Sequence, residues 1–149
     1  NTLLLFRFVE KHGKILYDMI KEESNGRTIF FVHGGTTADT REQIRHIVES
    51  ERNSVIVASY GVFSVGINIR NLHNIVFASP SKSRIRNLQS IGRGLRKSEN
   101  KSMATLYDVA DDLSYGSSHN YTLDHFEERK KIYKEEKFDV AEYFVQLKT

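Results

Sequence analysis

The stretch that decides the fold is Thr28–Ala58, with the sequence TIFFVHGGTTADTREQIRHIVESERNSVIVA. Both of its ends are apolar runs that do not alternate with polar residues, which is typical of strands buried on both faces of a parallel sheet. Between them, Ile44, Ile47 and Val48 recur at the spacing of one helix face. The stretch therefore predicts a strand, a helix and a second strand in succession, which is the repeating unit of an α/β fold.

The same alternation continues on both sides of this stretch. A stripe of Ile15, Leu16, Met19 and Ile20 predicts a helix before it, and Ser83–Lys97 carries the pattern of a helix after it. We therefore expect an α/β fold with a mainly parallel sheet, flanked by helices and joined by right-handed crossovers. The apolar runs that predict its strands are Thr2–Phe6, Thr28–Val32, Ser54–Ala58, Asn74–Ala78 and Ala104–Ala110.

Two local signals mark the ends of helices. Asn25 and Gly26 follow the first helical stripe, and both residue types accept the left-handed conformation that ends a helix. Asp39 has Glu42 three residues after it, the spacing of a capping box, which predicts that the second helix begins at Asp39.

The character of the sequence changes after Asp112. The connector SYGSSHN leads to a charged helical pattern, HFEERKKIYKEEKF, and then to an amphipathic piece with Val140, Phe144 and Leu147. Because the charges have both signs, a solvated helix face is favoured over a nucleic-acid arm. We expect one domain over residues 1–113 and a peripheral helical extension over residues 114–149.

Composition excludes several classes of protein. The 149 residues, 39% of them hydrophobic, are enough for one compact domain with a tail. The absence of cysteine excludes disulfides and thiolate metal sites, and the six histidines show no paired ligand spacing, so no metal site is expected. No apolar run is long enough for a membrane span, so we expect a cytoplasmic protein without membrane contact. Since the first residue is Asn1, we expect a fragment of a longer protein.

The stretch Ser90–Lys97, SIGRGLRK, places two glycines and three basic residues inside a helical pattern. On a helix, Gln89, Arg93 and Arg96 share one face, and the apolar residues around them share another. The glycines allow another surface to approach closely. Arginine forks match phosphate oxygens, so this face predicts an anionic ligand. Ordinary surface ion pairs are the alternative.

The rest of the sequence provides only half of a nucleotide site. No Gly-x-x-x-x-Gly-Lys-Ser/Thr loop is present to hold phosphates, and no Asp-Glu pair is present to hold magnesium. Asp108 ends an apolar run and can imitate a magnesium-holding acid, but no phosphate loop accompanies it. The arginines therefore fit the role of fingers, which stabilise phosphoryl charge from across an interface.

Four segments of the chain resemble segments of the superfamily 2 helicases and translocases. QSIGRGLR, Gln89–Arg96, resembles their sixth motif, Gln-x-x-Gly-Arg-x-x-Arg, and ASYGVFSVGINI, Ala58–Ile69, resembles their fifth. FFVHGGTTADTREQI is similar to the strand, turn and helix that lie between the fourth and fifth motifs. The opening NTLLLFRFVEKHGKILYDMI resembles the start of the second motor domain. The four segments stand in the family's order.

This resemblance implies a second RecA-like motor domain that faces an N-terminal RecA-like domain of the same protein. That absent domain would hold most of the ATP and Mg²⁺. By the resemblance, Arg96 is the finger on the γ-phosphate, Arg93 is a second phosphate or interdomain contact, and Gln89 is a relay. Gly66 and Asn68 match positions near the ribose or phosphates, although Asn68 replaces the family's commoner aspartate.

Nucleic acid is expected across the carboxyl ends of the strands, where open α/β sheets bind their ligands. The register of the fifth-motif hydroxyl is open, because the family's position falls on Tyr60 and Ser59 lies one residue earlier. His33 fits either a nucleic-acid contact or the end of a buried strand, and we favour the strand end. Arg41 is interpreted as an exposed helix residue or an ion-pair partner in preference to a DNA contact. The candidate nucleic-acid contacts are Gly34, Gly35, Thr36, Ser59 and Tyr60.

The expected activity is that of an ATP-dependent helicase or translocase. It would act, as a monomer, on branched or single-stranded DNA or on RNA:DNA hybrids. The isolated chain should hydrolyse almost no ATP, because it lacks the phosphate loop and the acid pair. The alternative is a non-catalytic α/β module that binds nucleic acid or protein through a degenerate motif. A small-molecule enzyme is disfavoured, because no Gly-x-Gly-x-x-Gly loop follows the first strand.

Overall fold

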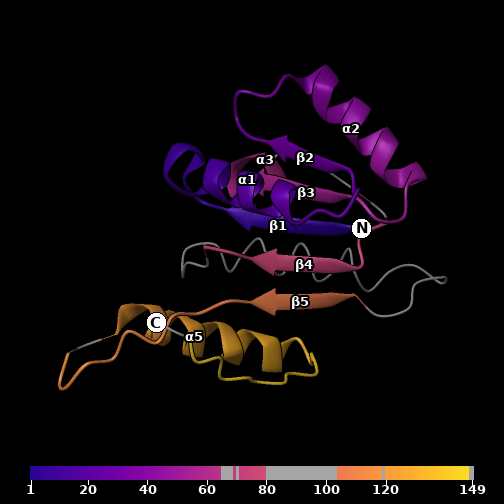
Figure 1. Ribbon diagram of the computed structural model, residues 1–149. Coiled ribbons are helices and arrows are strands. Elements are labelled where there is room, and N and C mark those ends of the chain that lie inside the picture. The colour runs from indigo at the N-terminus through magenta and orange to yellow at the C-terminus, as the bar shows by residue number, and fades with distance from the viewer. Residues whose placement is uncertain (65–68, 70, 80–103, 119, 148–149) are drawn as a thin grey trace.

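The structure is a computed structural model that describes residues 1–64, 69, 71–79, 104–118 and 120–147 (Figure 1). It contains a parallel sheet with helices on both faces, as expected from the alternation of strand and helix in the sequence. Its helices are η1 (Val9–Gly13, a π-helix), α1 (Lys14–Glu22), α2 (Ala38–Ser50), α3 (Tyr60–Ser64) and α5 (Tyr121–Glu135), and its strands are β1 (Thr2–Phe6), β2 (Ile29–Val32), β3 (Val55–Ser59), β4 (Asn74–Phe77) and β5 (Thr105–Asp108).

The five strands are arranged in the order β2-β3-β1-β4-β5, and every neighbouring pair is parallel. This confirms the predicted α/β class. The first four predicted strands agree with the observed ones to within one residue at each end. The fifth run was predicted over Ala104–Ala110, but β5 is shorter and ends at Asp108.

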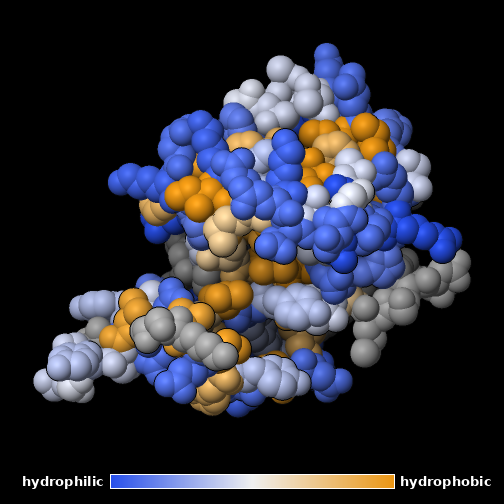
Figure 2. Space-filling model, in the orientation of Figure 1, coloured by the Kyte–Doolittle hydropathy of each residue, from blue (hydrophilic) through white to orange (hydrophobic). Residues whose placement is uncertain are grey.

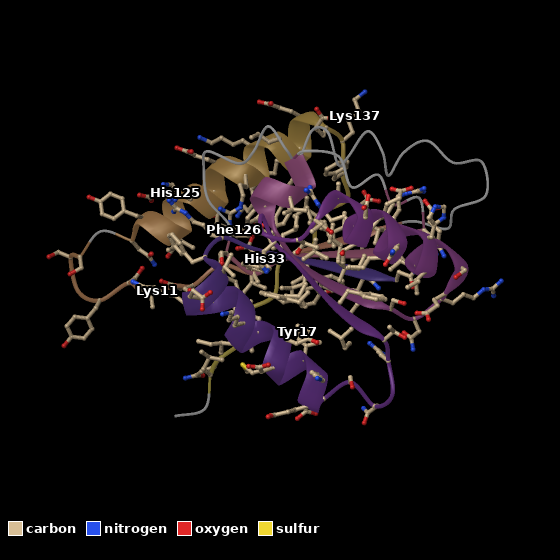
Figure 3. All side chains as sticks on the ribbon, turned by 90° about the horizontal axis from the view of Figure 1, so that it is seen from above. Lys11, Tyr17, His33, His125, Phe126 and Lys137 are labelled. Carbon is tan, nitrogen blue, oxygen red and sulfur yellow. The ribbon has the colours of Figure 1, made fainter. Side chains whose placement is uncertain are left out.

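Alternate side chains of the strands enter two separate apolar layers. Leu3 and Leu5 of β1 pack in one layer, which also holds Val48 of α2 and Tyr133 of α5. Phe6 lies in the other layer, against which Leu16, Tyr17 and Ile20 of α1 pack. Figures 1 and 3 show the same division, with α1 on one face of the sheet and α2 and α5 on the other.

The two helix-end signals have different outcomes. Asn25 and Gly26 have φ angles of 47° and 83°, so the predicted left-handed conformation is confirmed, but it lies in the turn after the helix, whose C-cap is Glu23 at a φ of −91°. The capping box was wrong, because α2 begins earlier. Thr37 is the N-cap, in an extended conformation, and its side chain accepts a hydrogen bond from the Thr40 N–H at 3.2 Å. Glu42 instead accepts a hydrogen bond from Arg45 Nε at 3.1 Å, and this bond lowers the Glu42 pKa.

The charged helix of the tail is confirmed as α5, but it is not peripheral. Arg129 and Tyr133 are buried, and Tyr133 belongs to the main apolar layer. The amphipathic piece was predicted wrongly as part of a helical tail. Residues 138–147 have no regular secondary structure, and Phe144 and Leu147 are exposed. A short helix in water needs an apolar face packed against another element, and these side chains have no such contact.

The predicted helix over Ser83–Lys97 lies outside the described residues. In the part of the chain that the structure covers, no helix is both long enough and apolar enough to cross a bilayer.

Gly13 lies at the junction of η1 and α1, where there is no room for a side chain. A Cβ on Gly13 would lie 2.4 Å from Cε2 and Cζ of Phe6, whose ring is fully buried and stacks on Phe31 with centroids 5.5 Å apart. We expect Gly13→Ala to lower the free energy of unfolding by about 1–3 kcal/mol, because the ring cannot move without disturbing the packed layer. Urea unfolding followed by circular dichroism measures this change.

Gly61 provides the matched control, since it lies in α3 and a Cβ there would meet nothing within 4 Å. Gly61→Ala should leave the free energy of unfolding unchanged or slightly raise it. Equal losses in the two variants would contradict the steric explanation for Gly13.

Candidate nucleic-acid and nucleotide interface

The carboxyl ends of all five strands lie at one edge of the sheet, because the strands are parallel (Figure 1). The turn after β2 and the end of β3 are neighbours at this edge, since Val32 pairs in register with Ala58. The structure therefore brings together the described candidate contacts, which come from two segments of the sequence: Gly34, Gly35 and Thr36 after β2, and Ser59 and Tyr60 at the end of β3.

The turn after β2 is closed by its own hydrogen bonds. The Thr36 N–H donates to the His33 carbonyl oxygen at 2.9 Å, and the His33 N–H donates to Thr36 Oγ1 at 3.1 Å. The Gly35 N–H donates to His33 Nδ1 at 3.1 Å. The amides of Gly35 and Thr36 are thus already engaged within the turn. Gly34 is its open position, because a Cβ there would meet nothing within 4 Å.

His33 organises this turn from the end of the buried strand. Its ring lies 5.4 Å from the ring of Phe31, centroid to centroid, and its side chain is half-buried. Since Nδ1 accepts a hydrogen bond, the neutral ring carries its proton on Nε2. His33 directly follows β2, in which Val32 is the one fully buried residue, and its ring shapes the turn; a contact of His33 with nucleic acid stays a prediction.

Ser59 and Tyr60 are both buried, with 8% and 3% of their surfaces exposed. The Tyr60 ring lies 5.8 Å from the ring of Phe77 and belongs to the main apolar layer. Sequence alone left open which hydroxyl would face a ligand. The structure places the Tyr60 ring in the core and Ser59 at the last position of β3.

Three further residues at this edge were missed by sequence reasoning. Ser79 Oγ contacts His12 Nδ1, which ties η1 to the chain just after β4. Figure 3 places Lys11, from the same helix, on the side of the sheet where His33 lies. Lys11 and His12 lie in the opening stretch that resembles the start of a second motor domain, but no single residue of it was singled out, and the only signal for Ser79 was that it follows a predicted strand.

Asp108 has a structural role at the end of β5. Its Oδ2 accepts hydrogen bonds from Arg129 Nε at 2.7 Å and from the Tyr133 hydroxyl at 2.5 Å, and its Oδ1 accepts one from Arg129 Nη2 at 2.9 Å. Burial, and next the negative charge of Asp108, raise the pKa of Tyr133 far above its ordinary value. Both carboxylate oxygens are engaged within the protein, so Asp108 is not an open magnesium ligand.

No metal site is found among the residues that the structure describes, since none of their His, Asp and Glu side chains gather into a group of three. Arg41 is half-buried, and its Nε has no hydrogen-bond partner within the described ranges. It therefore differs from both the exposed residue and the ion-pair partner that were expected. The candidate nucleotide residues Gly66, Asn68, Gln89, Arg93 and Arg96 lie outside the described residues.

Comparison with known proteins now decides the family. Residues 1–98 match the helicase conserved C-terminal domain. The chain belongs to this family. The matched range includes the four strands β1 to β4 and the whole stretch Gln89–Arg96, which resembles the sixth helicase motif.

One similar relative is the ATP-dependent DNA helicase UvsW of Enterobacteria phage T4. The chain is 37% identical to it over 157 aligned positions, which cover 99% of the chain and 31% of UvsW. The chain thus spans less than a third of the length of this relative. The crystal structure of T4 UvsW is also similar, with a TM-score of 0.72 and 39% identity over 93% of this chain and 29% of that one.

A more distant structure supports the fold alone. Domain 2 of the DEAD-box helicase Mss116p, solved with an RNA duplex, is 18% identical and has a TM-score of 0.59. The match covers 73% of this chain and 41% of that one. The RecA-like class that the resemblance implied is thus confirmed by structures as well as by the family.

The buried contact of Asp108 with Arg129 gives a test of how α5 is held. We expect Asp108→Ala to lower the free energy of unfolding by about 3–5 kcal/mol, because Arg129 would remain as a buried and uncompensated charge. Replacing Asp108, Arg129 and Tyr133 together by Leu, Met and Phe should cost less, since no charge is left buried. Denaturant unfolding of the full chain measures both changes.

Glu42→Ala is the control for loss of an exposed carboxylate. Glu42 pairs with Arg45 on the surface of α2, so its removal should change the free energy of unfolding by no more than about 1 kcal/mol. A loss at Asp108 as small as the loss at Glu42 would show that the buried pair does not hold α5.

Proposed function

We propose that the chain is the second RecA-like motor domain of an ATP-dependent helicase or translocase that acts on DNA. One observation carries this proposal: the helicase-family match runs through the Gln-x-x-Gly-Arg-x-x-Arg stretch. The 37% identity to an ATP-dependent DNA helicase, over nearly the whole chain, supports it. The substrates would be branched recombination and replication intermediates, single strands or RNA:DNA hybrids.

In this proposal the ATP site is shared between two domains of one protein. The N-terminal motor domain holds most of the ATP and Mg²⁺, since the present sequence has no phosphate loop. From this chain, Arg96 stabilises the charge that develops on the γ-phosphate, and Arg93 makes a second contact. Gln89 acts as a relay between the nucleotide and the N-terminal motor domain. Gly66 and Asn68 approach the ribose or phosphates of the nucleotide.

The nucleic-acid strand would cross the carboxyl edge of the sheet. Gly34, Gly35 and Thr36 lie there beside Ser59 and Tyr60, and backbone and hydroxyl groups of this kind hold phosphates without reading sequence. The exposed Gly34 is the position that a phosphate backbone can approach most closely. Closure of the two domains on ATP, and reopening after hydrolysis, would alternate the grip on the strand.

The remaining parts of the proposal concern organisation. Residues 1–113 form the motor domain and residues 114–149 form its C-terminal extension. The protein works as a monomer in the cytoplasm, which is that of the bacterial host if the chain is encoded by a phage like T4.

The finger role is tested by Arg96→Ala in the longer protein that contains both motor domains. We expect DNA-stimulated ATP hydrolysis to fall by about three orders of magnitude while ATP binding is retained, because a finger acts on the transition state. Steady-state hydrolysis and nucleotide-binding titrations measure the two properties. The isolated 149-residue chain should show almost no hydrolysis.

Arg45→Ala is the matched control, because Arg45 pairs with Glu42 and Glu49 on the surface of α2. The rate of DNA-stimulated ATP hydrolysis by Arg45→Ala should stay near that of the parent protein. If Arg96→Ala also hydrolyses ATP at a near-normal rate, the arginine is no finger and instead serves the domain interface or nucleic acid.

The nucleic-acid edge is tested by Gly34→Ala in the same longer protein. A Cβ at Gly34 meets open space in the protein, so thermal stability should not change. Binding of a labelled single-stranded oligonucleotide should weaken by about tenfold, because the methyl group would keep a phosphate away from the open backbone at Gly34. Fluorescence anisotropy at fixed salt measures the affinity.

Asn53→Ala serves as the control, since Asn53 is exposed just before β3, at the opposite edge of the sheet. The affinity of Asn53→Ala for the oligonucleotide should equal that of the parent protein. Unchanged affinity in Gly34→Ala would place the nucleic acid away from this turn.

A further inference from the structure

Among the described residues, the β4–β5 half of the sheet face that α1 covers is only partly shielded, and Figure 2 shows apolar side chains at the surface there. Leu4 of β1, Val76 of β4 and Tyr107 of β5 stand in register in one row, on the face that α1 covers. Their exposure rises along the row, since Leu4 and Val76 are half-buried and Tyr107 is 51% exposed. Val109, two residues after Tyr107, is 52% exposed.

The helix α1 does not extend over β4 and β5. Its residues Leu16, Tyr17 and Ile20 share a cluster with residues of β1, β2 and β3, but with none of β4 or β5. The opposite face of β4 is fully covered, with Ile75 and Phe77 buried. Parallel sheets are normally covered on both faces, so the exposed half requires a partner.

The C-terminal segment carries apolar side chains that also have no cover. Tyr143, Phe144, Val145 and Leu147 are each at least 80% exposed. Soluble proteins seldom leave such clusters in water unless they bind something. Residues 143–147 contain no charged side chain, and neither Val76, Tyr107 nor Val109 is charged, so contact between the two surfaces would bury no unpaired charge.

The path of the chain brings the segment to this face. Phe138 packs against the apolar layer on the α5 side, and Lys130 Nζ bonds to Glu142 Oε2 at 2.9 Å, which holds the segment beside α5. In Figure 1 the segment runs back along α5 below β5, and Figure 3, seen from above, shows its end on the α1 side of the sheet. The segment therefore passes around the β5 edge toward the partly shielded half.

The distance is within reach of the segment. Five residues beyond Glu142 span about 16 Å when extended, whereas neighbouring strands lie about 4.8 Å apart. The Lys130–Glu142 bond ends at Glu142, before the segment 143–147, so the segment can move while this bond is kept. The apolar side chains of residues 143–147 are each at least 80% exposed, so their movement breaks little packing.

We propose that residues 143–147 form an intramolecular strap that closes over the β4–β5 half of this sheet face, packing Tyr143, Phe144 and Leu147 on Val76, Tyr107 and Val109. The closed strap covers the partly shielded strands and braces β5, whose last residue, Asp108, anchors α5. This inference is independent of the proposed motor function, because none of its residues is a candidate contact for nucleotide or nucleic acid. The strap would also lie on the side of β5 opposite to the contact between Asp108 and α5.

Disulfide trapping tests the strap, because the chain has no cysteine of its own. In the full 149-residue chain, Phe144→Cys is combined with Tyr107→Cys, or with Val109→Cys in case the register differs by one row. The matched control combines Phe144→Cys with Ile47→Cys, an exposed position on α2, on the other face of the sheet. These positions are all exposed, so the substitutions should leave the fold intact.

With oxidised glutathione, we expect at least one of the two test pairs to form a disulfide about tenfold faster than the control pair, since closure raises the effective concentration of the two thiols. The product should run as a monomer on a non-reducing gel. Rates of both test pairs equal to the control would overturn the proposal. So would disulfide-linked dimers, which would make a second copy of the chain the occupant of the face. Neither result would bear on ATP hydrolysis by the longer protein.

Discussion

All five strands run in the same direction, and the rest of the structure depends on this constraint. Each connection must return from the carboxyl edge of the sheet to its amino edge, which places the helices over the two faces and the turns at the two edges. Parallel order also sends every strand toward one edge. Residues that are far apart in the chain, such as Gly34 and Ser59, thereby become neighbours there without any direct bond between them.

The carboxyl edge combines structural and functional demands. Gly35 and Thr36 use their amides to close the turn with His33, and Tyr60 contributes its ring to the core. Gly34 stays open, since a Cβ there would meet nothing within 4 Å. In the proposed function this open backbone is where a phosphate would approach, and phosphate contacts fix position without reading sequence.

Asp108 shows how one acidic residue can be read in two ways. At the end of a strand it has the position of a metal-binding acid, but Arg129 and Tyr133 occupy both of its oxygens. These contacts bind α5 to the sheet, so the charged helix is a part of the packed structure and not a solvated attachment. The partners lie some twenty residues after Asp108, on a helix whose charge pattern alone indicated exposure.

The sequence by itself determined the fold class, the strands to within about one residue, the left-handed turn at Asn25 and Gly26, and membership of the helicase family. These features follow from local spacing: uninterrupted apolar runs, one-face stripes and short motifs. Only the tertiary structure decided that Thr37 caps α2, that Tyr60 is a core residue, that Arg129 is buried on Asp108, and that Val140–Leu147 is not helical. Each of these depends on which surface lies opposite the residue, and the packing of distant segments sets that surface.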